Sequence, residues 1–338
     1  MLQCVPAPFP DELGRGYAQR VWARSGGVLA GGGRLLPALS EVTGLSELHL
    51  LRQHSHQGYM RMVSVAHAGL DMSCHADRWS NSTTLQMRSP SDRARFCPSC
   101  VSEDVGFHGI AYWRRAHQLP GLSLCAKHAV VLLEVSIDQV LRRSPNQCKE
   151  AVPALQDSEA NAYMQNQLIQ RFVTLSDMAL QLTTPIAAAV IADVLAARKC
   201  AIDGIGRCGL AAMVRDAVPE GWLARHFPAS VGRDKHDRVA SIDDVLRSRH
   251  VAHATKSYLL AMAALWQNPD DAMRECLAGA QESAEGFDLA GGERALAAVM
   301  GGMSIKSACR VEGIHLRDFE HALRRVAGMK ARTLFVGS

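Results

Sequence analysis

The sequence carries two pairs of residues whose types and spacing suit a metal ion. Cys97 and Cys100 form the first pair, and Cys125 and His128 form the second, further along the chain. Two ligands separated by two residues can turn inward on one tight loop, here called a knuckle, and two knuckles together complete a tetrahedron. Zn²⁺ prefers such a set of thiolate sulfur and imidazole nitrogen. Because four protein ligands leave no open position for a substrate, these residues predict a structural Zn²⁺ site.

The spacing leaves the fourth ligand less certain than the three cysteines. His128 is favoured because it shares a knuckle with Cys125, but His108, His117 and Cys148 are alternatives. The cysteines outside the two knuckles show no disulfide framework, so most of them are expected to be buried thiols. They are Cys4, Cys74, Cys148, Cys200, Cys208, Cys276 and Cys309.

Aromatic and basic residues stand together between the two knuckles. Tyr112 and Trp113 are followed directly by Arg114 and Arg115. Such a run can stack on bases and pair with phosphates. Aromatic residues beside a metal site more often form its small core, so we expect Tyr112 and Trp113 to pack there. Arg114 and Arg115 are candidate nucleic-acid contacts, with a solvated charged face as the alternative.

The elements that must position these residues are mostly helical. Apolar residues recur at helical spacing over 11–27, where Asp11 is expected to begin the helix and a glycine pair to end it. Two shorter helical pieces follow, joined by a tight turn at Gly44. They also fit a helix-turn-helix, for which DNA contact is the weaker interpretation. The apolar residues after His128 predict a strand. The predicted fold class is therefore mainly α, with helix-turn-helix domains flanking a small zinc-finger module.

A second helix-turn-helix pattern lies near the end of the sequence. Ala308 and Cys309 are small enough to let two helices cross, and Gly313 permits the turn between them. The second helix, at about 315–326, is expected to present basic residues that can reach bases or phosphates. These candidate nucleic-acid-binding residues are Arg317, His321, Arg324 and Arg325. A helical hairpin with a solvated charged face is the alternative.

These patterns divide the chain into four predicted parts. They are an N-terminal helical, helix-turn-helix-like domain at 1–92, a zinc-binding module at 93–135, a helical middle region at 136–250 and a C-terminal helix-turn-helix domain at 251–338.

Composition and charge bound the class of protein. The chain has 338 residues, of which 48% are hydrophobic, and a net charge of +4, which permits a nucleic-acid partner without requiring one. Basic residues concentrate at 93–128 and 304–334. No apolar run has the length of a membrane helix, and the start does not resemble an export signal, so we expect a cytoplasmic protein.

The sequence offers little support for an enzyme. The glycine-rich stretch near residue 30 lacks the Gly-Lys-Ser/Thr of a phosphate-binding loop. The acidic pairs Asp243-Asp244 and Asp270-Asp271 stand at expected helix starts, where they stabilise the helix dipole rather than gather a catalytic metal. We therefore predict no catalytic residues.

The region of the knuckles resembles the signature of the TniQ family, the target-selecting proteins of Tn7-like and related transposons. It contains a Cys-Pro-x-Cys, a Tyr-Trp-Arg, a His-Gln-Leu-Pro-Gly and a Cys-x-x-His followed by an apolar segment. The helix expected at 11–27 is also similar to the opening helix of the family, although Gly14, Arg15 and Gly16 depart from its usual apolar character.

This resemblance implies a non-enzymatic adaptor. Such a protein links a target-recognising element, either attachment-site DNA or a guide-RNA Cascade-type complex of a CRISPR-associated transposon, to the AAA+ ATPase and transposase of the transposon. A homodimer is the expected assembly. The alternative function is a zinc-containing helix-turn-helix transcriptional regulator that binds DNA.

Overall fold

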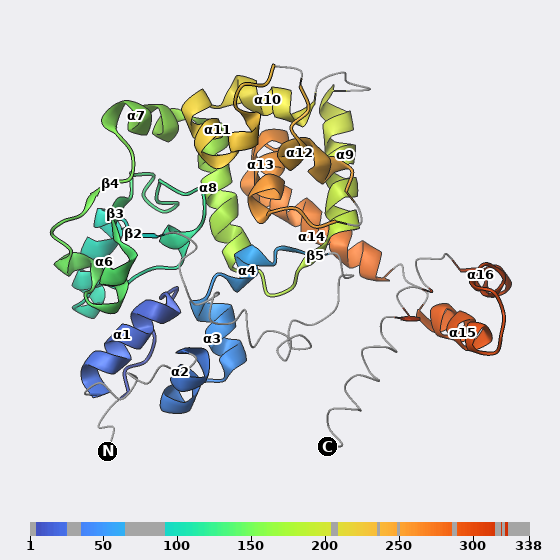
Figure 1. Cartoon of the computed structure of the whole chain (residues 1–338), viewed down its shortest axis with the longest axis horizontal. Coiled ribbons are helices and arrows are strands. Elements are labelled where there is room, and N and C mark those ends of the chain that lie inside the picture. Colours follow the sequence, from blue (N-terminus) through green and yellow to red (C-terminus); the bar gives the residue numbers. More distant parts are fainter. Residues whose placement is uncertain are drawn as a thin grey trace. The chain divides into compact units, whose positions relative to one another are not determined.

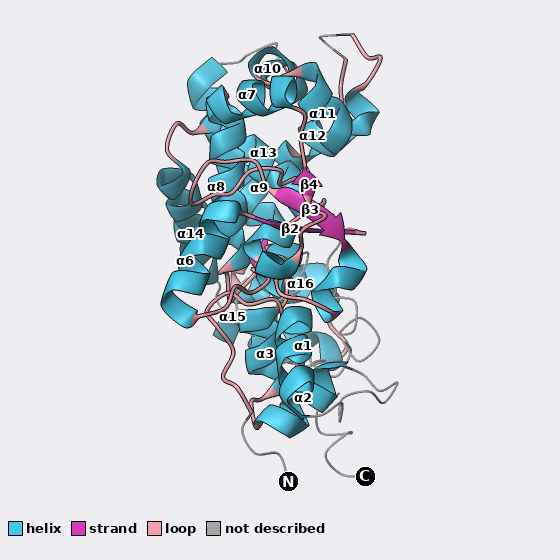
Figure 2. Ribbon diagram, turned by 90° about the vertical axis from the view of Figure 1, so that its left-hand side faces the viewer, coloured by secondary structure: helices cyan, strands magenta, loops and turns pink. Residues whose placement is uncertain are grey.

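The chain folds mainly into α-helices, with a few short strands between them (Figures 1 and 2). The computed structural model describes residues 5–25, 35–64, 92–203, 209–234, 237–248, 251–285, 289–314, 319 and 322–323. It divides into two compact units, Met1–Gly279 and Ala280–Ser338. The expectation of a mainly helical protein is confirmed. The predicted domain boundaries at 92, 135 and 250 lie within the first unit and stay predictions.

The first three helices share a small apolar core. They are α1 (Gly14–Ser25), α2 (Leu35–Thr43) and α3 (Glu47–His54), and the short helix α4 (Gln57–Met60) follows them. Tyr17 and Val21 of α1 pack with Leu39 of α2 and Leu50 of α3. Between α2 and α3 the backbone of Gly44 has φ 71°, a left-handed conformation that glycine adopts without strain. The predicted helix, tight turn and helix are present here.

The helix expected to begin at Asp11 begins later, at Gly14. Asp11 itself has φ 58°, outside the helical region. Its backbone carbonyl accepts a hydrogen bond from Arg115 N at 2.9 Å, so the chain at this point is bound to the segment between the knuckles. The expected start was wrong because this long-range contact determines the backbone of Asp11.

A three-stranded antiparallel sheet lies beside the predicted metal site. Its order is β2 (Arg93–Phe96), β3 (Leu133–Ser136) and β4 (Val152–Pro153), with Phe96 opposite Leu133. α6 (Pro98–His108) directly follows β2, and Gly109 ends it at φ 74°. The strand expected directly after His128 begins only at Leu133. Ala129, at φ 52°, turns the chain instead, and its N–H donates to Cys125 O at 2.8 Å.

The rest of the first unit is a helical body around α13 (Thr255–Leu265), which packs against α8 (Gln167–Leu180) and α9 (Ala188–Asp203). Leu259, Leu260 and Met262 of α13 are fully buried. β1 (Val63–Ser64) pairs in parallel with β5 (Ile186–Ala187). The remaining helices are η2 (Ala116–Gln118), η3 (Ile137–Leu141), η4 (Pro145–Gln147), α7 (Asp157–Gln165), α10 (Leu210–Ala217), α11 (Glu220–His226), η5 (Pro228–Ser230), α12 (Ala240–Asp243), η6 (Asp244–Leu246) and α14 (Pro269–Glu285).

The second unit contains α15 (Leu289–Met300) and α16 (Ile305–Glu312). Ala308 and Cys309 are buried in its core with Ala295, Leu296 and Phe319. The Ser304 side chain caps the start of α16, and Gly313 ends the helix at φ 66°. The helix expected at about 315–326 lies mostly outside the described residues, so the helix-turn-helix of this unit stays a prediction.

Candidate metal centre

The structure brings both predicted knuckles together. Cys97 stands at the N-cap of α6 and Cys100 in its first turn, so the start of one helix orients both sulfurs. Cys125 and His128 lie on a turn closed by two backbone hydrogen bonds, from Cys125 N to Val130 O and from Ala129 N to Cys125 O, each 2.8 Å. The sheet sets the two segments side by side, since β2 leads into the first knuckle and β3 follows the second.

The four ligand atoms have the dimensions of a tetrahedral zinc site. All lie within 4.8 Å of one another. With Zn–S and Zn–N bonds of about 2.3 and 2.0 Å, a tetrahedron has S–S edges of about 3.8 Å and S–N edges of about 3.5 Å. The Sγ atoms of Cys100 and Cys125 are 3.8 Å apart. His128 Nδ1 is 3.5 Å from Cys97 Sγ, 3.3 Å from Cys100 Sγ and 3.7 Å from Cys125 Sγ. The donor set and its spacing thus fit Zn²⁺.

Geometry separates His128 from the alternative fourth ligands. His117 Nε2 lies 3.7 Å from Cys100 Sγ and 3.6 Å from Cys125 Sγ, but this residue is not part of the group in which all ligand atoms are close. His108 packs its ring against Phe9 instead, with centroids 4.4 Å apart. The Cys148 thiol donates to Ser144 O at 3.7 Å. His128 is the only one of these candidates in the described cluster.

Hydrogen bonds within the cluster favour one thiolate, at Cys97, while the pKa values of Cys100 and Cys125 are raised by the same close contacts and by burial. Hydrogen bonds from the Cys100 and Cys125 thiols lower the pKa of Cys97 and favour its thiolate. Burial lowers the pKa of His117 to about 3, so that its imidazole is neutral near pH 7. A neutral His117 can donate one N–H toward the sulfurs of Cys100 and Cys125. Such a donor reduces the excess negative charge that three thiolates would place around one divalent ion.

The aromatic residues between the knuckles pack inside the protein, as predicted. Trp113 is buried to 1% exposure and meets Phe96 edge to face, with ring centroids 5.8 Å apart. Its indole N–H donates to Arg143 O at 2.8 Å, so its polar atom is satisfied. Tyr112 is also buried and stacks on Phe9 at 4.8 Å. These contacts attach the segment to the sheet and to the beginning of the chain.

Arg115 is buried and engaged within the chain. Its side chain is 1% exposed, with Nε 2.9 Å from Asp11 Oδ1. Its Nη1 donates to the carbonyls of Arg52 at 2.8 Å and Ser55 at 2.9 Å. A single carboxylate and two carbonyls, all distant in sequence, thus neutralise and solvate this guanidinium internally, and its role as a nucleic-acid contact stays a prediction.

Arg114 is also engaged within the chain, although it remains partly exposed. Its Nη2 is 2.5 Å from Asp104 Oδ1, and its guanidinium lies 5.1 Å from the centre of the Tyr112 ring. Burial raises the pKa of Asp104, and the hydrogen bond from Arg114 opposes that shift. Arg114 is therefore first a partner of a buried carboxylate, and its role as a nucleic-acid contact stays a prediction.

The other predicted contacts, Arg317, His321, Arg324 and Arg325, lie outside the described residues.

Sequence reasoning missed three residues that hold the site. Gln118 accepts from Arg95 N at 2.9 Å and donates to Arg95 O at 2.6 Å, which fixes β2 beside the knuckles. Asp11 receives the Arg115 side chain. Glu103 approaches both Lys127 and His128. A signal existed for Glu103 alone, because it continues the three-residue spacing of Cys97 and Cys100 along one helix.

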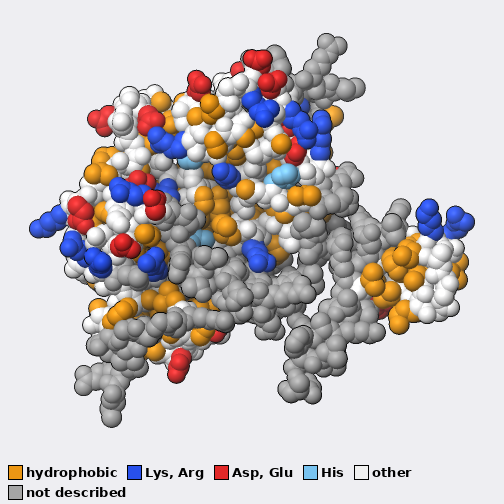
Figure 3. All heavy atoms as spheres, viewed as in Figure 1, with side chains coloured by type: hydrophobic (Ala, Val, Ile, Leu, Met, Phe, Trp, Pro, Cys, Tyr) orange, Lys and Arg blue, Asp and Glu red, His pale blue; other side chains and the backbone are white. Residues whose placement is uncertain are grey.

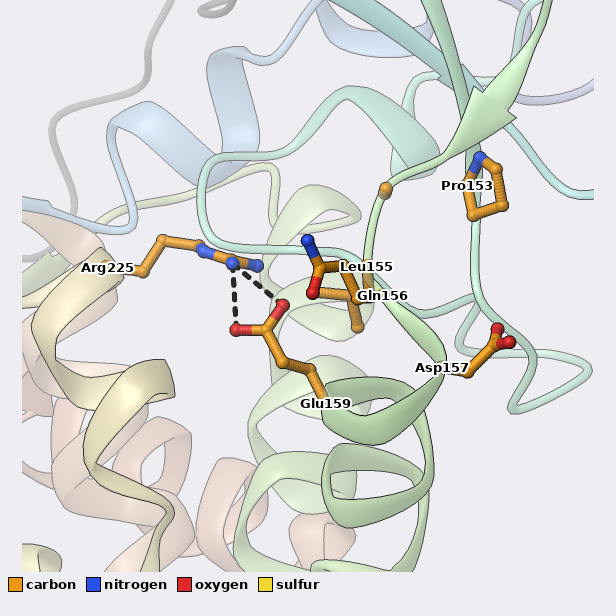
Figure 4. Close-up of a pocket in the computed structure, with 7 residues that line it drawn as sticks. Pro153, Leu155, Gln156, Asp157, Glu159 and Arg225 are labelled. Atoms are coloured by element: carbon orange, nitrogen blue, oxygen red, sulfur yellow. Dashed lines mark hydrogen bonds and ion pairs between the residues drawn. The ribbon is translucent and has the colours of Figure 1, made fainter.

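Among the pockets of the described residues, one lies away from the cluster of ligands and another borders it. One is a surface pocket where Arg225 of α11 reaches Glu159 of α7, with Nη2 3.0 Å from both carboxylate oxygens (Figure 4). None of the predicted site residues lines it. The other is a cleft beside Cys100 and Cys125, which Asp177 of α8 also lines. On the face drawn in Figure 3, acidic and basic side chains intermingle over the described part of the first unit.

Taken together, the fold and the site define a mainly helical protein with a Cys₃His cluster between two knuckles. None of the described helices combines the length and the apolar character needed to cross a membrane. Residues 4–132, which hold the cluster, match the family model described as TniQ.

One relative of known name is the Transposon Tn7 transposition protein TnsD of Escherichia coli. It is 40% identical to this chain over 48 residues, which are 14% of this chain and 9% of that protein. The match thus covers less than a tenth of the relative.

Proposed function

We propose that this chain is a non-enzymatic target-selection adaptor of Tn7-like transposition. The observation that carries the proposal is the TniQ match over residues 4–132, which includes all four members of the Cys₃His cluster. The similarity to a Tn7 transposition protein supports the same role. In this proposal the chain links a target-recognising element to the AAA+ ATPase and the transposase of its transposon.

The cluster has a structural role in this proposal. Cys97, Cys100, Cys125 and His128 would hold one Zn²⁺, which would cross-link the two knuckles. All four residues come from the chain, so the site has the closed ligand set of structural zinc. The bonds of Arg115 then connect the segment between the knuckles to α3, and the bond between Arg95 and Gln118 connects that segment to β2. The result is a rigid surface on which partners can dock.

A transposition assay tests the function. A marked transposon is supplied with the transposase and ATPase of its own element, with or without this chain, and the insertion sites are sequenced. We expect insertions to gather at a defined target only when the chain is present. The same insertion pattern without the chain would contradict the proposal. The same assay is run with Cys125→Ser, which lacks one ligand of the cluster. Cys200→Ser, at an exposed cysteine outside the cluster, is its matched control.

The target-recognising element is, in our proposal, a guide-RNA Cascade-type complex that a homodimer of this chain joins, with directly read target DNA as the competing arrangement. Size-exclusion chromatography shows whether the chain co-elutes with the RNA complex and as how many copies. Gel shifts with naked duplex test the competing arrangement, for which specific affinity in about the nanomolar range and a strong salt dependence are expected. Specific binding to naked duplex, without co-elution with the RNA complex, would overturn the proposal that a guide-RNA complex recognises the target.

A further inference from the structure

The two ring nitrogens of His128 face different groups. Nδ1 lies toward the three sulfurs, while Nε2 is 3.1 Å from Oε1 of Glu103. A histidine can bind a metal through Nδ1 only when that nitrogen carries no proton, and the proton then resides on Nε2. A carboxylate at Nε2 accepts a hydrogen bond from that N–H. The contact with Glu103 therefore favours the tautomer that metal binding requires.

Glu103 belongs to the same helix as the first knuckle. Cys97, Cys100 and Glu103 follow one another at intervals of three residues at the start of α6. Residues three apart on a helix lie on neighbouring parts of one face. The helix that supplies two sulfurs therefore also extends a carboxylate across to the second knuckle, where it meets His128 and Lys127.

Lys127 holds the carboxylate from its other side. Its Nζ approaches Oε2 of Glu103, whereas His128 approaches Oε1. Both Lys127 and Glu103 are well exposed, at 59% and 44%, so their ion pair is expected to contribute little to stability by itself. His128 is less exposed, at 19%. The contact that is expected to affect metal binding is thus the one between Glu103 and the imidazole of His128.

We propose that Glu103 is a positioning residue for metal binding, which fixes the tautomer and the ring orientation of His128. The inference rests on the proposed Zn²⁺ site and goes beyond it by assigning a fifth side chain to that site. Partners that bind the outer nitrogen of a metal-ligating histidine typically account for about 10- to 100-fold in metal affinity. We expect the loss of the Glu103 carboxylate to weaken Zn²⁺ binding within that range.

Competition with a chromogenic zinc chelator tests this inference on the full chain. Glu103→Ala is expected to raise the dissociation constant for Zn²⁺ about 10- to 100-fold. Glu103→Gln should recover part of that loss, because an amide oxygen still accepts from Nε2–H but carries no charge. Lys127→Ala is the matched control, since it removes the other partner of Glu103 and leaves the imidazole contact in place. We expect it to change the affinity less than about threefold.

Two further measurements distinguish positioning from a general loss of structure. Melting in saturating Zn²⁺ should be the same for wild type and Glu103→Ala. The absorption bands of the Co²⁺-loaded protein should change in Glu103→Ala and not in Lys127→Ala, because they report the ligand geometry. Unchanged Zn²⁺ affinity in Glu103→Ala, or an equal loss in Lys127→Ala, would overturn the inference and leave the zinc site standing. A wild-type chain that holds no Zn²⁺ would overturn both.

Discussion

Two regions of the first unit are stabilised in different ways. The cysteine module, from β2 to β3 (93–136), buries many polar and charged groups, whereas the α8–α13 core, formed by those two helices, is mostly apolar and buries only the small hydroxyl residues Ser176, Thr255 and Ser257 beside its apolar side chains. The buried polar residues of the cysteine module include Arg95, Asp104, Arg115, His117 and Gln118. In the α8–α13 core, Phe172, Leu175, Leu259, Leu260 and Met262 are fully buried.

The difference teaches how each region depends on its neighbours. Apolar burial has no preferred direction, so many side chains of the right size can fill a core. Buried polar groups need partners at particular positions, and a missing partner leaves a desolvation cost. The cysteine module therefore depends on a few long-range bonds and on its metal ligands, and the α8–α13 core on the sum of many contacts.

The largest effect is expected from Cys125→Ser. Loss of one ligand should abolish the binding of about one Zn²⁺ per chain. It should also lower the yield of soluble protein, because a structural zinc site contributes on the order of 10 kcal/mol to folding. Elemental analysis and the yield of soluble protein measure the outcome. Cys200→Ser is the control, since Cys200 is exposed and lies outside the cluster. If the zinc-free protein melts at the same temperature as the zinc-loaded wild type, the cysteine module does not depend on a metal. The proposed difference between the two regions would then be wrong.

Arg115→Ala should have the second largest effect. It leaves the half-buried Asp11 carboxylate with the Ala116 N–H as its remaining donor and takes the Arg115 donor away from two backbone carbonyls. Breaking a buried ion pair from one side costs about 3–5 kcal/mol. Arg143→Ala, at an exposed arginine whose partner Glu150 is exposed as well, is the control and should cost less. Urea unfolding of both variants with Zn²⁺ present checks this order, and equal losses would show that burial does not distinguish the two arginines.

The sequence was sufficient for the cluster and insufficient for its surroundings. Spacing identifies Cys97, Cys100, Cys125 and His128, because a knuckle is a local structure. The packing of Trp113 could also be predicted, since a large aromatic beside a metal site has few other roles. The burial of Arg115 could not, because its partner Asp11 is 104 residues away. No local pattern reports such a contact.

Helix and strand limits failed for a related reason. Helical periodicity extends back to Asp11, but a backbone bond to Arg115 removes that residue from the helix. Apolar residues continue without interruption after His128, but the turn at Ala129 closes the knuckle and delays the strand to Leu133. In both places backbone hydrogen bonds override the local preference: a long-range bond at Asp11 and the local bonds of the knuckle at Ala129. The α8–α13 core was easier to predict, because its helical patterns agree with its packing.

Leu260→Ala tests the α8–α13 core by itself. Leu260 is fully buried in α13, and truncation of such a leucine costs about 2–5 kcal/mol. The loss should appear in urea unfolding, whereas zinc content and Zn²⁺ affinity of the folded protein should not change. Ala254→Gly, at the cap before the same helix, is a mild comparison. A Leu260→Ala protein that loses zinc while folded would show that the two regions are coupled more closely than their different interactions suggest.

The smallest effect concerns pH and His226, which lies at the end of α11 against Trp222 with ring centroids 4.8 Å apart. Burial lowers the pKa of His226 to about 3, with Arg225 and Lys256 acting in the same direction. Its folded pKa is thus below the unfolded value of about 6.5, so stability is lost as pH falls from about 6.5 toward 3. Near pH 5.5 the loss should be about 1 kcal/mol.

His226→Gln should remove that part of the pH dependence. Wild type and variant are compared by urea unfolding at pH 7.5 and 5.5, with zinc content measured at both values so that acid release of the metal is accounted for. We expect the gap in unfolding free energy between the two proteins to shift in favour of the variant by about 1 kcal/mol at the lower pH. His49→Gln, at an exposed histidine of α3, is the control. An equal shift in both variants would mean that this part of the acid sensitivity does not arise from the buried imidazole.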